Sequence, residues 1–373
     1  MTIPAPAEPG MPLAEVDTPA LIVDLDAFED NLKRMADALA DKSVELRAHA
    51  KTHKCPQVAL RQIAMGAIGQ CCQKVAEAEA MVMGGVADVL ISNEVVGPRK
   101  LRRLAALARQ ARVAVCADDA KNVVDLDQAA AGAGVNLRVL VEIDVGNSRC
   151  GVEPGEEAVK LAKLIEAQPN LTFAGLQAYN GSAQHRQTFA ERRAAIDKVI
   201  EKARRTRDLL AKAGLACELI SGAGTGTYRF EAASDVFTEI QAGSYVFMDA
   251  EYAAIEGEDG DPYRDFAHSL FILTTVMSRT RREMAVCDAG LKAASPDSGP
   301  PTVYGRNDAE YTRGSDEHGR LALVLDSPIE IGEKIRLVPG HCDPTINLYD
   351  WYVCYRGDVV EAVWPITARG AIY

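Results

Sequence analysis

From Ala20 to about Asp249 the chain alternates short apolar runs with longer segments of helical periodicity, and this alternation limits the folds open to it. Short runs of Val, Ile and Leu between helices are typical of parallel strands, because both faces of such strands are covered. The candidate strands are residues 21–25, 44–50, 67–72, 89–92, 113–117, 137–143, 173–178, 219–221 and 240–247. So many βα units fit a closed barrel better than an open sheet.

The helix predicted after residues 173–178 has the clearest periodicity. Its apolar residues recur at the spacing of one buried stripe: Phe189, Ile196, Val199, Ile200, Ala203 and Leu210. Gly214 is placed to end this helix in a left-handed cap.

The pattern changes after an acidic, turn-forming cluster at residues 256–262. From Ser269 onward the apolar runs are short, β-branched and separated by Gly and Pro, which indicates a mostly antiparallel β domain. We therefore expect an α/β barrel of the TIM type over residues 20–262. A β domain is expected over residues 263–373, with residues 1–19 packing on it.

Composition and charge exclude several classes of protein. Apolar residues make up 48% and charged residues 25% of the chain, which is the balance of a protein with a core. The net charge of -12 disfavours binding to nucleic acid or an anionic membrane. The basic residues Lys202, Arg204, Arg205 and Arg207 are interpreted as one solvated helix face.

The localisation is predicted from the lack of signal-peptide, membrane-span and disulfide patterns in the sequence. Residues 1–12 lack the basic start and apolar run of a signal peptide, and no apolar stretch has the length of a membrane span. The nine cysteines lack the spacing of a disulfide framework, which indicates a reducing compartment. We expect a cytoplasmic protein.

The segment of residues 47–54 contains two lysines and two histidines at the end of the second candidate strand. Barrel enzymes place catalytic groups at this end of their strands. A lysine there can attack an aldehyde if burial beside other cations lowers its pKa. The same residues also fit a structural or solvated role.

Two glycine-containing loops follow later strands. Residues 221–228 include Gly222, Gly224 and Gly226, and consecutive N–H groups in such a loop can form an anion-binding nest. Residues 243–245 form a second candidate loop after the next strand start. One such loop alone fits a plain turn equally well, but two at successive strand ends resemble a phosphate cradle.

The β domain contains a candidate metal site in residues 339–344. If this segment is a strand, residues two apart face the same way, so His341 and Asp343 could hold one ion. One imidazole and one carboxylate leave positions for water or substrate, which suits catalytic Mn²⁺, Mg²⁺ or Co²⁺ better than structural zinc. A hydrogen-bonded His–Asp pair is an equally good interpretation.

Three more side chains follow candidate strands and could contact a ligand at the barrel mouth: Tyr179, His185 and Arg149. The alternative for His185 is an exposed loop position. The alternative for Arg149 is a structural ion pair with Asp144.

Taken in order, these segments resemble the D-threonine aldolase and D-serine dehydratase family, which are fold-type III pyridoxal-phosphate enzymes related to alanine racemase. The resemblance runs from residues 17–20 to residues 364–370 and so covers nearly the whole chain. Its specific marks are residues 47–54, 71–75, 91–96, 288–292, 316–319 and 341–343.

The resemblance implies a cofactor, pyridoxal 5'-phosphate, and a homodimer. It implies that Lys51 carries the Schiff base and that Arg149 approaches the phenolic oxygen. The residues near the phosphate would be Gly224, Thr225, Gly226, Gly243, Ser244 and Tyr245. Gln241 would face the pyridine nitrogen as a neutral partner, where alanine racemase has an arginine.

The resemblance further implies that Tyr179 and His185 lie near the substrate and that His341 and Asp343 hold a divalent metal, with Mn²⁺ favoured. The D-serine dehydratases resemble users of a His and Cys pair, so the harder Asp343 favours aldol cleavage. The expected reaction is cleavage of D-threonine or D-allo-threonine to glycine and acetaldehyde.

Three alternatives stay open at this point. The first is an aldolase for D-3-hydroxyaspartate that yields glycine and glyoxylate, and the second is a dehydratase for D-serine or D-3-hydroxyaspartate. The third is a noncatalytic carrier of pyridoxal phosphate.

Overall fold

The computed structural model describes residues 4–373, so residues 1–3 of the expected N-terminal arm lie outside the described residues. The chain forms two compact units. One comprises the described residues up to Arg34, Thr52–Cys55 and Ser244–Gly370, and the other comprises Met35–Lys51, Pro56–Gly243 and Ala371–Tyr373. The expected fold class, a parallel α/β barrel with a mostly antiparallel β domain, is confirmed.

The second of these units is built on eight parallel strands that close into a barrel, because β2 pairs with both β3 and β9. The strands are β2 (Glu45–His49), β3 (Gly69–Cys72), β4 (Asp88–Glu94), β5 (Arg112–Ala117), β6 (Leu137–Glu142), β7 (Leu171–Ala178), β8 (Leu219–Gly222) and β9 (Glu239–Ile240). Five successive strands contribute to one buried cluster: Cys71, Leu90, Ala114, Cys116, Leu140 and Ala174.

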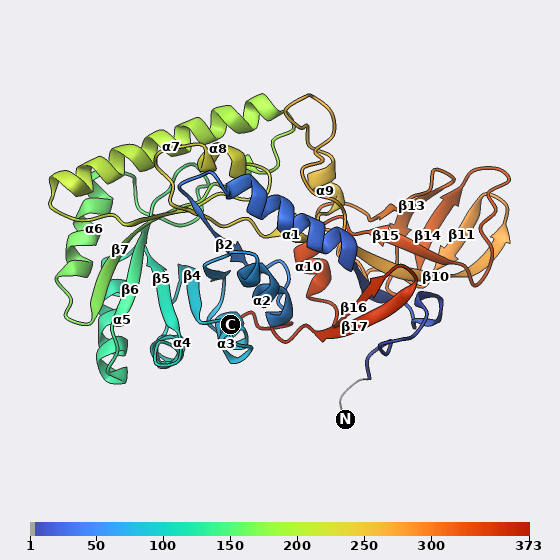
Figure 1. Cartoon of the computed structure of the whole chain (residues 1–373), viewed down its shortest axis with the longest axis horizontal. Coiled ribbons are helices and arrows are strands. Elements are labelled where there is room, and N and C mark those ends of the chain that lie inside the picture. Colours follow the sequence, from blue (N-terminus) through green and yellow to red (C-terminus); the bar gives the residue numbers. More distant parts are fainter. Residues whose placement is uncertain (1–3) are drawn as a thin grey trace. The chain divides into compact units, whose positions relative to one another are not determined.

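Helices alternate with the barrel strands along the chain and cover the outside of the barrel (Figure 1). They are α2 (Pro56–Ala64), α3 (Val75–Met83), α4 (Pro98–Leu107), α5 (Ala120–Ala133), α6 (Glu156–Glu166), α7 (Phe189–Lys212) and α8 (Tyr228–Ala232), with the short 3-10 helix η2 (Gly181–Ala183). Helix α1 (Leu25–Leu39) precedes β2 in the sequence.

Helix α7 begins and ends at the signals its sequence carries. Thr188 and Glu191 form a capping box at its start. Gly214 follows the C-cap with φ +78°, the left-handed conformation expected there. Four of the six residues of the predicted stripe are buried, and Phe189 and Ile200 are half-buried.

The other unit contains a nine-stranded sheet in which seven strands run in the order β13-β14-β11-β10-β1-β16-β17. Its strands are β1 (Ala20–Asp24), β10 (Leu270–Arg281), β11 (Met284–Cys287), β12 (Thr302–Val303), β13 (Ala309–Gly314), β14 (Gly319–Leu323), β15 (Lys334–Val338), β16 (Trp351–Arg356) and β17 (Val359–Pro365). The short helices of this unit are η1 (Leu13–Glu15), η3 (Ser244–Val246), α9 (Ala250–Ala253) and α10 (Cys342–Ile346).

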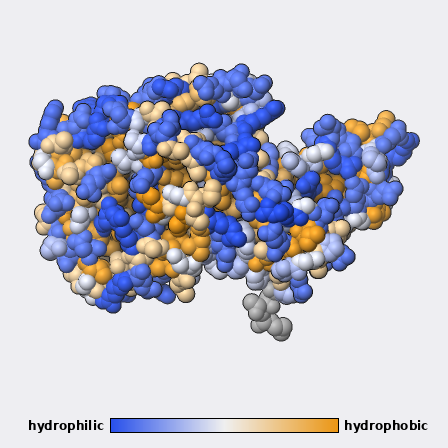
Figure 2. All heavy atoms as spheres, viewed as in Figure 1, coloured by the Kyte–Doolittle hydropathy of each residue, from blue (hydrophilic) through white to orange (hydrophobic). Residues whose placement is uncertain are grey.

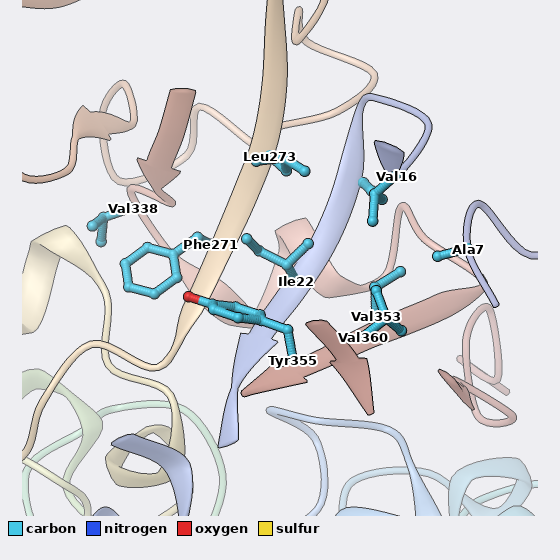
Figure 3. Close-up of a cluster of buried hydrophobic side chains, with 10 residues drawn as sticks. Ala7, Val16, Ile22, Phe271, Leu273, Val338, Val353, Tyr355 and Val360 are labelled. Atoms are coloured by element: carbon cyan, nitrogen blue, oxygen red, sulfur yellow. The ribbon is translucent and has the colours of Figure 1, made fainter. Parts of the chain in front are cut away.

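Strand β1 corrects one expectation from the sequence. The apolar run 21–25 was predicted among the barrel strands, but β1 pairs antiparallel with β10 and parallel with β16. A fully buried strand carries the same apolar pattern in either sheet, so the pattern alone does not identify its neighbours. Figure 3 shows Ile22 of β1 among buried side chains of this sheet, with Ala7 and Val16 beside them.

A second correction concerns residues 240–247, which were predicted as one strand. Strand β9 contains only Glu239–Ile240, and Ser244–Val246 forms the 3-10 helix η3. The Met248 N–H donates to the Ser244 carbonyl at 2.7 Å, so this apolar segment is a buried turn. The acidic turn at residues 256–262 is closed by a bridge between Glu256 and Pro262 within the same unit.

Candidate active site

The candidate residues of the barrel unit all follow the C-terminal ends of its strands. Parallel strands point the same way, so their C-terminal ends lie at one end of the barrel. Lys51 follows β2, Arg149 follows β6, and Tyr179 follows β7. The loop of residues 223–227 follows β8, and Gln241 and Gly243 follow β9.

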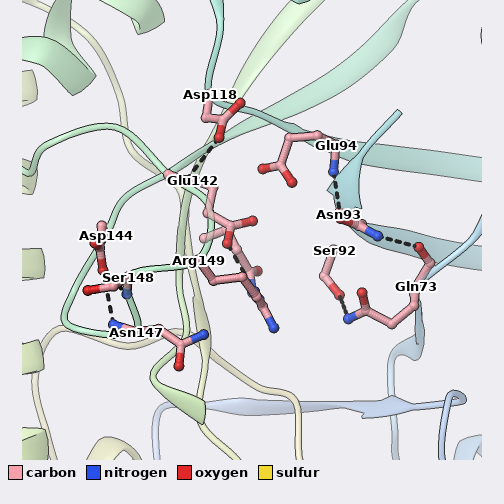
Figure 4. A network of polar contacts seen from close by, with 12 residues as sticks. Gln73, Ser92, Asn93, Glu94, Asp118, Glu142, Asp144, Asn147, Ser148 and Arg149 are labelled. Carbon is pink, nitrogen blue, oxygen red and sulfur yellow. Dashed lines mark hydrogen bonds and ion pairs between the residues drawn. The ribbon is translucent and has the colours of Figure 1, made fainter. Parts of the chain in front are cut away.

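The backbone of Lys51 is held by the ring of His49, the last residue of β2. The Lys51 N–H donates to His49 Nδ1 at 3.3 Å. The Nε2 of the buried His49 lies 3.3 Å from Ser92 Oγ and 3.0 Å from Gln73 Nε2. Ser92 lies in β4 and Gln73 directly follows β3, and Figure 4 shows the hydrogen bond between these two side chains. The turn that carries Lys51 is therefore anchored to two further strands.

Arg149 contacts Glu142 and Tyr179. Its Nη2 lies 3.6 Å from Glu142 Oε1, and its guanidinium carbon lies 5.8 Å from the centre of the Tyr179 ring. The geometry suits a cation over an aromatic face. These contacts join the end of β6, the loop after it and the residue that follows β7, and Figure 4 shows the ion pair between Glu142 and Arg149.

The expected alternative partner of Arg149, Asp144, has a different role. Its Oδ1 accepts the N–H groups of Gly146, Asn147 and Ser148 at 2.9, 3.0 and 3.1 Å. Partial burial alone would raise the pKa of Asp144, but these N–H groups lower it overall. A carboxylate placed just after β6 thus folds the loop that carries Arg149, and the predicted ion pair with Asp144 is wrong.

Further carboxyl groups lie beside Glu142 (Figure 4). Burial, and next the charge of Glu94, raise the pKa of Glu142, because two neighbouring carboxyl groups cannot both ionise cheaply. Among the described residues, Glu94 Oε1 and Glu142 Oε2 are buried without a hydrogen-bond partner. The raised pKa means that Glu142 holds a proton more readily than an ordinary carboxyl group does.

Glu94, Asp118 and Cys150 each present a possible metal-ligand atom, and these atoms lie within 4.8 Å of one another. Asp118 Oδ2, however, accepts the Gly151 N–H at 2.9 Å. Burial and Glu94 raise the pKa of Cys150 to about 11, so its thiol stays protonated at neutral pH. Sequence reasoning missed this group, although Glu94 ends β4 and Asp118 follows β5, the same position that drew attention to Lys51.

The glycine loop after β8 is buried and packs on Gln184. Gln184 Oε1 accepts the Gly226 N–H at 3.0 Å, and Gln184 Nε2 donates to Thr227 Oγ1 at 2.8 Å. A Cβ on Gly224 would lie 2.6 Å from Gln184 Oε1, so close packing requires glycine there. The Gly226 N–H is thus engaged within the protein.

Gln241 belongs to a buried chain of polar side chains. Its Nε2 donates to Gln177 Oε1 and to Ser221 Oγ, both at 2.7 Å. Ser221 Oγ in turn donates to Glu239 Oε2 at 3.0 Å.

His185, by contrast, is exposed in the segment after η2.

The predicted metal pair lies in the unit that contains the nine-stranded sheet, but not on a strand as expected. Strand β15 ends at Val338, His341 is the N-cap residue of α10, and Asp343 lies in its first turn. The Cys342 N–H donates to Asp249 Oδ2 at 3.0 Å, and this contact helps to start the helix. His341 Nε2 still lies 4.0 Å from Asp343 Oδ2.

The residues present fit the groups that the sequence implies. An amine, a guanidinium and two buried loops with glycines at one end of a barrel suit an aldehyde cofactor that carries a phosphate. An imidazole nitrogen and a carboxylate oxygen 4.0 Å apart can both approach one divalent ion. Burial alone would lower the pKa of His341, but the carboxylates of Asp343 and Asp297 raise it overall.

Two domain families match the chain in order. The alanine racemase N-terminal domain matches residues 23–251, and a serine dehydratase domain matches residues 269–355. The 3-hydroxy-D-aspartate aldolase of Paracoccus denitrificans (strain Pd 1222) is 48% identical over 372 residues, with 99% of this chain and 96% of that protein covered. The D-threonine aldolase of Arthrobacter sp is 48% identical over 373 residues, with 99% and 97% covered.

A solved structure of D-threonine aldolase from Filomicrobium marinum has a TM-score of 0.97 and 50% identity, and the match covers 99% of this chain and 100% of that one. The chain belongs to the D-threonine aldolase and D-serine dehydratase family. The enzyme is therefore a lyase of the aldolase type, which excludes the noncatalytic carrier.

A membrane span requires a helix that is both long and apolar. Hydrophilic side chains cover much of the face in Figure 2, with hydrophobic ones visible between them. No helix within residues 4–373 is both long enough and apolar enough to cross a bilayer. None of the nine cysteines, all of which lie within residues 4–373, forms a disulfide bond.

Proposed function

We propose that the enzyme cleaves D-configured 3-hydroxy amino acids, with D-threonine and D-allo-threonine as substrates that yield glycine and acetaldehyde. The observation that carries the proposal is the gathering of Lys51, Arg149 and two glycine-containing loops at one end of the barrel. The His341 and Asp343 pair, and the similarity to D-threonine aldolases, support the reaction and the need for a divalent ion.

Pyridoxal phosphate would be held by groups that follow four strands, β2, β6, β8 and β9. Lys51 would bind its aldehyde carbon, and Arg149, which Glu142 contacts at 3.6 Å, would face its phenolic oxygen. Its phosphate would lie near Gly224, Thr225, Gly226, Gly243, Ser244 and Tyr245. Gln241 would be a neutral partner for the pyridine nitrogen. When bound, the cofactor supplies an electron sink for the carbanion left after the Cα–Cβ bond breaks.

His341 and Asp343 would hold the metal, for which we propose Mn²⁺, with Mg²⁺ or Co²⁺ as substitutes. The ion would supply a positive charge that lowers the pKa of the substrate hydroxyl. A structure of a D-threo-3-hydroxyaspartate dehydratase mutant that is 26% identical to this chain is described as a metal-free form.

His185 and Tyr179 are the proposed residues beside the substrate. The imidazole of His185 would accept the proton of the substrate hydroxyl, directly or through water. Tyr179 would border the same space, with its ring held by the guanidinium of Arg149 at 5.8 Å.

A second substrate is supported by the comparisons. The 3-hydroxy-D-aspartate aldolases of Paracoccus denitrificans are as similar to this chain, at 48% identity, as the D-threonine aldolase of Arthrobacter sp. An enzyme for that substrate would release glyoxylate in place of acetaldehyde.

Product analysis with the purified, cofactor-loaded enzyme tests these proposals. D-threonine, L-threonine and D-3-hydroxyaspartate would each be supplied with Mn²⁺ or with chelator. We expect glycine and acetaldehyde from D-threonine only, and only with the ion. Faster release of glyoxylate would favour the second substrate, ammonia with a keto acid would show a dehydratase, and full activity in chelator would contradict the metal requirement.

We also propose that the enzyme is a homodimer, as the family resemblance implies. Size-exclusion chromatography with light scattering would give twice the mass of the chain. A monomeric mass at assay concentration, with activity retained, would contradict this.

A further inference from the structure

Asp297 touches the candidate metal site from the side away from Asp343. Its Oδ2 lies 2.7 Å from His341 Nδ1, while His341 Nε2 lies 4.0 Å from Asp343 Oδ2. The two carboxylates therefore occupy opposite nitrogens of one ring. Nothing in the sequence singled out Asp297, which is 44 residues from His341 and lies in the irregular segment between β11 and β12.

The chemistry of this contact determines which ring nitrogen can bind an ion. An ionised carboxylate only accepts hydrogen bonds, so Nδ1 must carry the proton in the contact with Asp297. A neutral imidazole then has its lone pair on Nε2, the atom that faces Asp343. Because Nδ1 and Nε2 point in different directions, a carboxylate bound at Nδ1 cannot also reach an ion bound at Nε2.

We propose that Asp297 is a positioning residue for the metal, which fixes the tautomer and orientation of His341 and leaves Nε2 and Asp343 Oδ2 to bind the ion. Outer carboxylates of this kind also make the ligand imidazole more basic. The inference rests on the proposed function, because it requires the His341–Asp343 pair to be a metal site.

Asp297 is itself held in place by hydrogen bonds. Ser295 Oγ donates to Asp297 Oδ1 at 2.9 Å, and the Ser295 N–H donates to Thr345 Oγ1 at 3.2 Å. Thr345 lies in α10, the helix whose first turn contains Asp343. The Asp297 segment and the metal pair are therefore tied to the same short helix.

The backbone also brings this segment close to His341. A Cβ added to Gly340 would lie 2.3 Å from the Gly299 carbonyl oxygen, which is too short for a contact between a carbon and an oxygen that are not bonded to each other. Glycine at 340 thus permits the loop that carries Asp297 to pack directly on the residue before His341. The contact between Asp297 and His341 is one part of a packed arrangement.

The test is Mn²⁺ affinity, measured by calorimetry and by the electron paramagnetic resonance of free Mn²⁺. It uses cofactor-loaded enzyme stripped of metal by chelator and dialysis. We expect Asp297→Ala to weaken Mn²⁺ binding about 10- to 100-fold. Asp297→Asn should lose less, because its amide oxygen can still accept from Nδ1. Saturating Mn²⁺ should restore kcat in both variants, since the proposed role of Asp297 is to hold His341 and not to take part in the reaction.

The control is Asp326→Asn, which removes an exposed charge paired with Arg282 in the same unit. Asp326 has φ +69°, which asparagine also tolerates. The control should bind Mn²⁺ as the unmodified enzyme does, and thermal unfolding of the metal-free proteins should show that Asp297→Ala is folded.

Other outcomes separate this inference from the proposed function. The metal site itself is contradicted if the unmodified enzyme does not bind Mn²⁺. It is also contradicted if His341→Ala and Asp343→Ala both bind Mn²⁺ as tightly as the unmodified enzyme does. If those two variants lose binding while Asp297→Ala stays within about twofold of the unmodified enzyme, only the inference on Asp297 is overturned. A loss as complete as that of His341→Ala also overturns it, because Asp297 would then be a ligand.

Discussion

The amine of Lys51 is the group on which the proposed chemistry depends. Neighbouring side chains hold the backbone that carries this amine. The ring of His49 accepts the Lys51 N–H, and Ser92 and Gln73 contact that ring in turn. The backbone of the turn is therefore restrained. A restrained backbone limits the positions that the amine can reach, which is a requirement for catalysis by a single nucleophile.

Lys51→Ala should remove the visible absorbance of the bound cofactor, because the covalent link to the amine is lost. Lys51→Arg is the matched control, since a guanidinium keeps the charge but cannot form that bond. Spectra recorded after dialysis of both loaded variants check this. A visible band that persists in Lys51→Ala would show that another residue holds the cofactor.

His185→Gln should lower kcat for D-threonine about 10²- to 10⁴-fold, the usual contribution of a positioned proton acceptor. The cofactor spectrum should not change, because the proposed covalent link is made by Lys51 and His185 takes no part in it. Unchanged kcat would assign proton removal to a different group.

Individual elements show how short polar contacts decide structure that apolar patterns leave open. Helix α8 begins after the glycine loop, and its N-cap residue Thr227 donates from Oγ1 to Glu231 Oε1 at 3.0 Å. Burial raises the pKa of Glu231 to about 8 from an ordinary value of 4.5. Its Oε2 has no hydrogen-bond partner among residues 4–373, which is consistent with a protonated group at neutral pH.

Glu231 should make stability depend on pH. The pKa of Glu231 is 4.5 in the unfolded state and about 8 in the folded state. At a pH between these two values, the folded state binds more protons than the unfolded state. The free energy of unfolding should therefore fall as pH rises through this window. Glu231→Gln should flatten that dependence in urea denaturation at a series of pH values. An identical slope in the variant and the unmodified enzyme would mean that Glu231 is not protonated in the fold.

A buried ion cluster lies at the seam where the first and last strands of the closed barrel meet. Arg47 of β2 bonds both oxygens of Glu239 in β9 at 3.1 and 3.0 Å, and bonds Asp88 of β4 at 2.6 Å. Only two residue pairs form the backbone register between β2 and β9. Side-chain bonds across so short a seam strengthen the closure.

Arg47→Met should lower the free energy of unfolding by about 3–5 kcal/mol, the cost of leaving buried carboxylates without their partner. The double variant Arg47→Met with Glu239→Gln should recover part of this loss, because it removes one of the uncompensated charges. Chemical denaturation at constant cofactor concentration measures both. A loss below about 1 kcal/mol in the single variant would show that the cluster contributes little.

The local pattern of residues determined the main features of this protein. The alternation of apolar runs and helical segments predicted the barrel, and the capping residues of α7 predicted how that helix ends. The catalytic candidates followed from their positions after strands, because strand direction in a parallel barrel places every such loop at one end. Each of these inferences needs only neighbours along the chain.

Tertiary structure alone decided which distant residues meet. It placed β1 beside β10 and β16, paired Arg149 with Glu142, and set Asp297 against His341. The physical reason is that hydrogen bonds and ion pairs act over a few ångströms, whereas the partners lie up to hundreds of residues apart in sequence. A local pattern identifies a buried strand or an available carboxylate, but the packing of the whole chain selects its partner.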